Sequence, residues 1–190
     1  METMTACEMQ QAQTSGGQAI DPRRFRDACA RFGTGVTVVT THCDGDDHGM
    51  TANAFMSISL SPPMIAISIA ETARILPKIR KTGRFAVSVL SEGMEDIAWH
   101  FAGKPRSLGR DCLRCDVRPA AVAGAAASFI ADVADEIVAG DHIVFIGRVQ
   151  ELTSDPGGRP LLFFGGRFGV LAEPQAASLL AEYQDHGMFW

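Results

Sequence analysis

Short runs of β-branched and apolar residues, separated by turn residues, recur along most of this 190-residue chain. Such runs predict β-strands, which we expect at residues 36–41, 50–60, 64–69, 85–90, 129–138, 143–152, 160–164 and 167–171. Most of these strands follow one another through tight turns rather than through helical crossovers, an arrangement typical of antiparallel sheets. The pattern therefore predicts a mainly β (α+β) fold, an antiparallel β-barrel with a few flanking helices.

The flanking helices are expected in three places. Asp21 and Pro22 supply a cap and a first-turn proline for a helix over residues 23–32. Apolar residues at helical spacing predict further helices over residues 74–81 and 92–101. We expect a charged turn at residues 44–49 and an irregular loop over residues 102–119.

One domain accounts for most of the chain. A hydrophobic fraction of 46% is ordinary globular usage, and no internal linker interrupts residues 20–172. Residues 1–19 are polar and rich in Gln, Ser and Gly, so we expect a disordered lead-in rather than a secretory signal. Residues 173–190 are expected to form a C-terminal arm.

Charge and cysteine content exclude several classes of protein. The net charge of −5 is spread among mixed signs, which gives no basic surface for nucleic acid or an anionic membrane. The longest apolar stretch, residues 64–70, is far shorter than a membrane span. Five cysteines in a chain with no signal favour a reducing, cytoplasmic setting. Cys112 and Cys115 form one C-x-x-C pair in a polar loop, and we expect no metal there.

Common catalytic motifs are missing from the sequence. Gly33-Thr34-Gly35 starts like a dinucleotide-binding fingerprint, but Val38 stands where the third glycine belongs and a strand follows. The chain has no G-x-S-x-G elbow, no H-E-x-x-H and no Walker phosphate loop. Without further information, the residues indicate a soluble β-rich domain.

Four signatures occur in one order along the chain. They are F-G-T-G-V-T-V-V-T at residues 32–40, T-A-N-A-F at 51–55, S-I-S-L-S-P-P at 57–63 and G-D-H at 140–142. In these segments, and over residues 21–171 as a whole, the chain closely resembles the flavin reductase components of two-component flavin monooxygenases. These enzymes belong to the FMN-binding split-barrel family. The resemblance implies a split barrel and a flavin site.

The resemblance also implies which residues bind the flavin. A flavin ring is flat and apolar with polar edges, so small residues are needed where backbone N–H groups approach it. A guanidinium group suits the flavin phosphate, which favours Arg74 although Ala73 stands where the family has Ser or Thr. The flavin-binding residues implied by the family are Met50, Thr51, Ala52, Asn53, Ala54, Ser57, Ser59, Arg74, His100 and Phe101.

A second set of residues is implied for the nicotinamide. His142 of the G-D-H signature is the catalytic candidate, and it would position the nicotinamide amide rather than move a proton. Glycines permit close stacking and an arginine can meet a phosphate. The nicotinamide-binding residues are Asp141, His142, Phe164, Gly166, Arg167 and Phe168. Phe168 stands where tyrosine is common in the family.

The activity implied by the resemblance is that of an NAD(P)H-dependent flavin reductase. Such an enzyme transfers a hydride from NADH or NADPH to FMN or FAD and supplies the reduced flavin to a partner monooxygenase. The family also implies a homodimer. Two alternatives stay open: a non-catalytic flavin carrier, and a reductase of another acceptor such as a corrinoid. The sequence does not choose between FMN and FAD or between NADH and NADPH.

Overall fold

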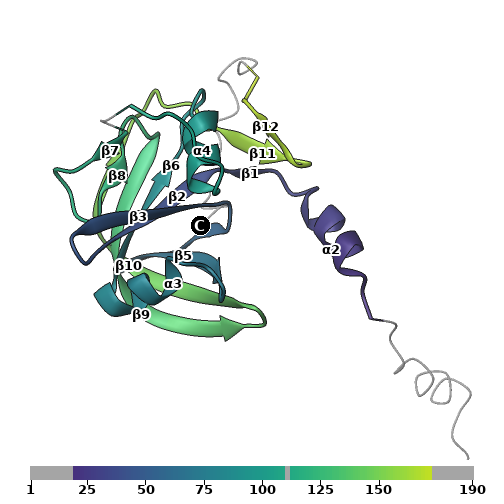
Figure 1. Ribbon diagram of the computed structural model, residues 1–190, viewed down its shortest axis with the longest axis horizontal. Helices are drawn as coiled ribbons and strands as arrows, with labels where there is room; N and C mark the ends of the chain where they lie inside the picture. Colours follow the sequence, from purple (N-terminus) through teal and green to yellow (C-terminus); the bar gives the residue numbers. More distant parts are fainter. Residues whose placement is uncertain (1–18, 110–111, 173–190) are drawn as a thin grey trace, which may run out of the picture. The chain divides into compact units, whose positions relative to one another are not determined.

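The computed structural model describes residues 19–109 and 112–172 (Figure 1). The expectations for residues 1–18 and 173–190 fall outside this range. Residues up to Phe32 and residues from Gly33 onward form two separate units.

From residue 19 onward, the first unit holds one helix, α2 (Pro22–Cys29). Its cap is the one the sequence predicts, because the Asp21 side chain accepts a hydrogen bond of 2.8 Å from the Arg23 N–H and Pro22 occupies the first turn. The helix ends at Cys29, before the expected end at Phe32. None of its residues is buried.

A seven-stranded antiparallel sheet dominates the second unit. Its strand order is β3-β2-β6-β9-β10-β5-β4, and every pairing within it is antiparallel. The expected antiparallel architecture is therefore confirmed. The strands are β2 (Thr37–Cys43), β3 (Asp46–Ala52), β4 (Phe55–Leu60), β5 (Pro63–Ala70), β6 (Arg84–Val89), β9 (Ala127–Ala139) and β10 (His142–Ser154).

Smaller elements surround this sheet (Figure 1). One small sheet has the order β1-β11-β12, and β7 pairs with β8. Helices α3 and α4 correspond to the two helices expected in this part of the sequence, although each starts two or three residues later. The elements are β1 (Thr34–Gly35), α3 (Leu76–Thr82), α4 (Glu95–Phe101), β7 (Leu113–Arg114), β8 (Ala121–Val122), β11 (Leu162–Phe164) and β12 (Arg167–Gly169).

Three sequence expectations need correction. The single strand expected over residues 50–60 is divided, because β3 ends at Ala52 and β4 begins at Phe55. The charged turn expected at residues 44–49 is only two residues long, because Asp44 (φ 56°) and Gly45 (φ 89°) form it and β3 already starts at Asp46. Two successive positive φ angles match the twist of a tight hairpin, and Asp-Gly is a preferred pair for it. The loop expected over residues 102–119 contains the short strand β7.

Two apolar clusters form the core of the second unit. The larger lies among the long strands and includes Val39, Ile67, Phe85 and Phe145, all at most 1% exposed. The smaller joins Val36, Val38, Leu90 and Leu161 to Ala98 of α4. This second cluster fixes α4 against β2 and the segment before β11, which is where the candidate site lies.

Candidate functional site

A cavity of about 230 Å³ lies where the end of β3, helix α4 and the β11–β12 hairpin meet. Its lining is largely aromatic or small. The lining residues are Val36, Thr51, Ala52, Asn53, Ala98, Trp99, Ala102, Phe163, Gly166 and Phe168. The cavity therefore joins residues expected on the flavin side, Thr51 to Asn53, with residues expected on the nicotinamide side, Gly166 and Phe168.

The β3 wall of the cavity is held by two hydroxyl groups. The Thr37 hydroxyl donates to the carbonyl of Ala52 at 2.7 Å, and the Thr51 hydroxyl donates to the carbonyl of Ala98 at 2.7 Å. The second bond satisfies a carbonyl in the last turn of α4 and so joins the helix to the strand. After Ala52 the chain leaves the sheet, and the exposed Asn53 side chain lies at the cavity.

The opposite wall comes from a two-residue hairpin. Gly165 (φ 57°) and Gly166 (φ 79°) connect Phe164 to its cross-strand partner Arg167. Both glycines need a left-handed backbone conformation that side chains disfavour. One pair further from the turn, the rings of Phe163 and Phe168 meet edge to face at 5.7 Å between centroids. The turn thereby places both rings at the cavity.

Trp99 of α4 completes the aromatic wall, and sequence reasoning missed it. Its ring lies 5.2 Å from that of Phe168 at an interplanar angle of 68°. Ala98 and Ala102, four residues apart, line the cavity beside it. The sequence held no motif that marked Trp99, because its place at the cavity depends on contacts of α4 with β3 and with the hairpin.

The other residues expected at the flavin lie outside this cavity. Met50 packs against the larger core cluster. The ring of Phe101 covers Gly49, where a Cβ would come within 2.6 Å of it, and Nδ1 of His100 accepts a hydrogen bond of 3.2 Å from the Arg106 N–H. Ala54, Ser57 and Arg74 are exposed, and Ser59 is half-buried.

Asp141 lies in the two-residue turn between β9 and β10, and His142 is the first residue of β10. Nδ1 of His142 is 2.7 Å from Oδ1 of Asp141, and this hydrogen bond lowers the pKa of the Asp141 carboxyl. The carboxylate therefore accepts the Nδ1 proton, which leaves Nε2 for other partners. In Figure 1 this turn lies away from α4 and from β11 and β12, so His142 does not line the cavity. Phe164 and Arg167 of the β11–β12 hairpin are exposed and do not line the cavity either.

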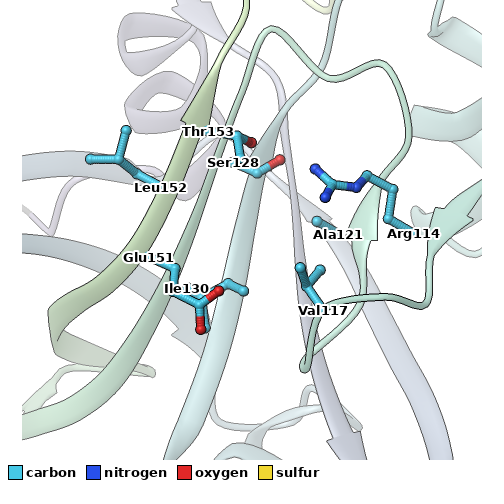
Figure 2. A pocket seen from close by; sticks show the side chains of 8 residues that line it. All are labelled: Arg114, Val117, Ala121, Ser128, Ile130, Glu151, Leu152 and Thr153. Carbon is cyan, nitrogen blue, oxygen red and sulfur yellow. The ribbon is translucent and has the colours of Figure 1, made fainter.

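A second cavity, of about 60 Å³, lies between the β7–β8 segment and the strands β9 and β10 (Figure 2). Arg114, Ser128 and Glu151 are among its lining residues, and none of the expected site residues is. Its volume corresponds to roughly two water molecules. Cys112 and Cys115 flank β7 as free thiols. Residues 19–109 and 112–172 contain no group of three or more side chains that could hold a metal ion.

The larger cavity fits part of a flavin or a nicotinamide. A flat ring with polar edges needs apolar walls, small residues at close approach and a few polar groups at its rim. Trp99, Phe163 and Phe168 provide the walls, Ala52 and Gly166 provide close approach, and Asn53 provides an amide. The volume lies somewhat below the roughly 300–1,000 Å³ of pockets for drug-sized ligands, so in this conformation it accepts one ring system.

Comparisons with known proteins show the family of this chain. Residues 29–172 match the flavin reductase like domain, so the chain belongs to that family. It is 40% identical over 155 residues to an NADH-dependent flavin reductase of a Rhodococcus species, across 80% of this chain and 88% of that protein. It is 39% identical over 150 residues to the reductase component of 4-hydroxyphenylacetate 3-monooxygenase of Thermus thermophilus, across 79% and 97% of the two chains.

A solved structure extends the comparison. The NADH:FAD oxidoreductase SgcE6 of Streptomyces globisporus, in complex with NAD and FAD fragments, superposes with a TM-score of 0.74 at 34% identity. The match covers 84% of this chain and all of that one. The resemblance inferred from the four ordered signatures is thereby confirmed. Separately, no helix in the part of the chain that the structure describes has the length and apolarity to cross a membrane.

Proposed function

We propose that this chain is an NADH-dependent flavin reductase, which reduces FMN or FAD and supplies the reduced flavin to a partner monooxygenase. The observation that carries the proposal is the cavity in which the small-residue end of β3 faces the aromatic side chains of α4 and the β11–β12 hairpin. The relatives support the same activity, since they are named as NADH-dependent reductases or as a monooxygenase reductase component.

The chain's own residues have positioning tasks in this reaction. A bound flavin supplies the chemistry, by accepting a hydride from the reduced nicotinamide. Asn53 and the backbone of Thr51 to Ala54 would bind the polar edge of the ring. Arg74, exposed and without an ion pair among the described residues, would hold a phosphate. The family resemblance also places Met50, Ser57, Ser59, His100 and Phe101 on the flavin side.

Nicotinamide binding is assigned to the second set of residues. Asp141 fixes the proton of His142 on Nδ1, so the other ring nitrogen can meet the nicotinamide amide. The family resemblance also assigns Phe164, Gly166, Arg167 and Phe168 to the dinucleotide, although the β9–β10 turn lies away from their hairpin within one chain (Figure 1). Hydride transfer needs the two reacting atoms about 3–3.5 Å apart. Excluding water and holding both rings in register are therefore the main contributions of the protein.

We further propose that the enzyme is a cytoplasmic homodimer. Strand β4 is an edge of the seven-stranded sheet, and its Met56 and Leu60 are 59% and 69% exposed. An unpaired edge with exposed apolar side chains favours association with a second copy. The four cysteines within the described residues are free thiols, which supports a reducing compartment.

Steady-state kinetics test the proposal. The full chain is mixed with NADH or NADPH and with FMN or FAD, and oxidation of the nicotinamide is followed. We expect oxidation that requires both flavin and protein and that is faster with NADH. Flavin binding without oxidation in any pairing would favour a carrier, and activity only with a corrinoid would favour another acceptor. Arg74→Ala should raise the KM for the flavin, whereas Arg148→Ala, at an exposed position of β10, should not.

A further inference from the structure

The largest side chain at the cavity is the indole of Trp99. We propose that Trp99 is a flavin-binding residue of the reductase, and that its indole is the wall against which the planar ring of the flavin packs. This inference rests on the proposed function and adds a residue that neither the ordered signatures nor the expected site includes.

The position of Trp99 is fixed through its backbone. The preceding residue, Ala98, is buried, and its carbonyl accepts both the hydroxyl of Thr51 at 2.7 Å and the N–H of Ala102 at 3.0 Å. The helix that carries the indole is therefore bonded to the strand that forms the facing wall. A ring packed between them would contact both elements at once.

The orientation of the indole is fixed by its neighbours. The ammonium group of Lys104 lies 4.0 Å from the ring centroid, within the distance at which a cation is attracted to an aromatic face. The Lys104 N–H also donates to the Trp99 carbonyl at 3.0 Å. The Phe168 ring meets the indole from the hairpin. Lys104 is exposed, so it acts from the solvent side as a positioning residue.

The remaining lining explains why Trp99 would contribute most of the affinity for the ring. Apart from the aromatic residues, the walls are mostly small, with Ala52, Ala98, Ala102 and Gly166 among them. The Thr51 hydroxyl is already used in a hydrogen bond. Affinity for a ligand here must therefore come chiefly from contact with apolar surface, and the indole supplies the largest share of that surface. Its size also sets the width of the cavity.

Binding measurements without turnover test this inference. The full chain is titrated with lumiflavin, which has the ring but no phosphate, and with FMN, in the absence of nicotinamide. We expect Trp99→Leu to raise both dissociation constants about tenfold and Trp99→Phe about threefold. Because the indole contacts the ring, the factor should be the same for both ligands. The control is Leu152→Ala, at an apolar residue of β10 that is 61% exposed and does not line this cavity, which should bind as the wild type does.

Lys104 provides a second variant that preserves the indole. Lys104→Met should weaken lumiflavin binding less than Trp99→Leu does. Lys104→Arg should bind lumiflavin as the wild type does, because the cation above the ring is retained. In kinetics, the KM for the flavin should rise in Trp99→Leu while the KM for NADH stays within about twofold.

The outcomes separate this inference from the proposed function. Unchanged lumiflavin binding in a folded Trp99→Leu variant, with an active wild type, would overturn the role of Trp99 alone. A rise in the KM for NADH alone in Trp99→Leu would overturn it as well, since the ring at the indole would then be the nicotinamide. A wild type that oxidises no NADH with any flavin would refute the proposed function instead.

Discussion

The 2.7 Å hydrogen bond between His142 and Asp141 defines which nitrogen of the imidazole is open to a substrate. The same bond lowers the pKa of the Asp141 carboxyl. A carboxyl whose pKa is lower in the folded than in the unfolded chain favours folding above its unfolded pKa, and this contribution is lost as the pH falls through the folded value. The pair is therefore intact throughout the neutral range.

We expect Asp141→Asn to raise the KM for NADH by roughly tenfold, because the charge that holds the Nδ1 proton is lost. The KM for the flavin should not change. In the wild type, no step in the kinetic pH profile between about pH 5 and pH 8 should come from Asp141. Steady-state kinetics with each substrate varied provide the measurement. An equal rise in both KM values would contradict the nicotinamide-side assignment.

The close packing around Gly147 of β10 predicts the effect of adding a side chain there. A Cβ at this position would lie 2.5 Å from Cζ of Phe85, which is fully buried. Gly147→Ala should lower the free energy of unfolding by about 1–3 kcal/mol through overpacking. Gly35→Ala is the control, because a Cβ there meets nothing within 4 Å and the backbone is not left-handed. Denaturant unfolding measures both, and equal stabilities of the two variants would disprove the packing argument.

Individual site residues were only partly predictable. Thr51, Ala52, Asn53, Gly166 and Phe168 were expected from the family resemblance, and the cavity contains all five. Trp99 was not expected, because one tryptophan in a short helix is more often a core residue. Its role depends on the Thr51 hydrogen bond and on the Phe168 ring, which are contacts between distant parts of the sequence.

Helix α4 and strand β3 act together at the cavity. The link between them is the hydrogen bond from the Thr51 hydroxyl to the Ala98 carbonyl. Helix α4 has only seven residues and no side-chain cap, so this hydrogen bond adds to the apolar packing of Ala98 in positioning Trp99.

Thr51→Val preserves the shape of the side chain and removes this hydrogen bond. We expect a loss of about 0.5–1.5 kcal/mol in the free energy of unfolding and weaker lumiflavin binding, because α4 would no longer be fixed against β3. Thr153→Val, at an exposed strand position, is the matched control. Stability and binding that both match the wild type would show that other contacts position the helix.

The boundaries of the strands were harder to predict from the sequence than their presence. The expected strands occur, except that the one expected over residues 50–60 is divided between the end of β3 and β4, and β3 begins at Asp46, inside a stretch assigned to a turn. The charged residues Asp46 and Asp47 concealed the strand, whereas Asp44-Gly45 carried the hairpin signal. In β3 these charges are tolerated because it is an edge strand, and Nδ1 of His42 forms a 2.9 Å hydrogen bond with the Asp47 carboxylate.

In the second unit as a whole, the sheet ends in two unpaired edges, β3 and β4. The antiparallel architecture followed from the succession of tight turns in the sequence. The strand order did not, because β9 and β10 are long enough to pair with different partners along their length. The β3 edge carries polar side chains, whereas the β4 edge exposes Met56, Ile58 and Leu60.

The proposed homodimer predicts the effect of charge on this edge. The double variant Met56→Lys, Leu60→Lys should convert a dimer to a monomer, because burying two lysines at an apolar contact is unfavourable. Leu152→Lys, at an apolar residue of β10 that is 61% exposed, should leave the mass unchanged. Light scattering after size-exclusion chromatography gives the mass. A wild type that is monomeric at all concentrations would refute the dimer.

Anaerobic mixing of the protein with equal amounts of NADH and flavin tests the proposed reaction most directly, because oxygen cannot then reoxidise the product. We expect the absorbance of the oxidised flavin to disappear together with that of NADH, one molecule for one molecule, at a rate that requires the protein. Flavin that binds to the protein but stays oxidised, or that is reduced no faster than without protein, would contradict the assignment of this chain as a flavin reductase.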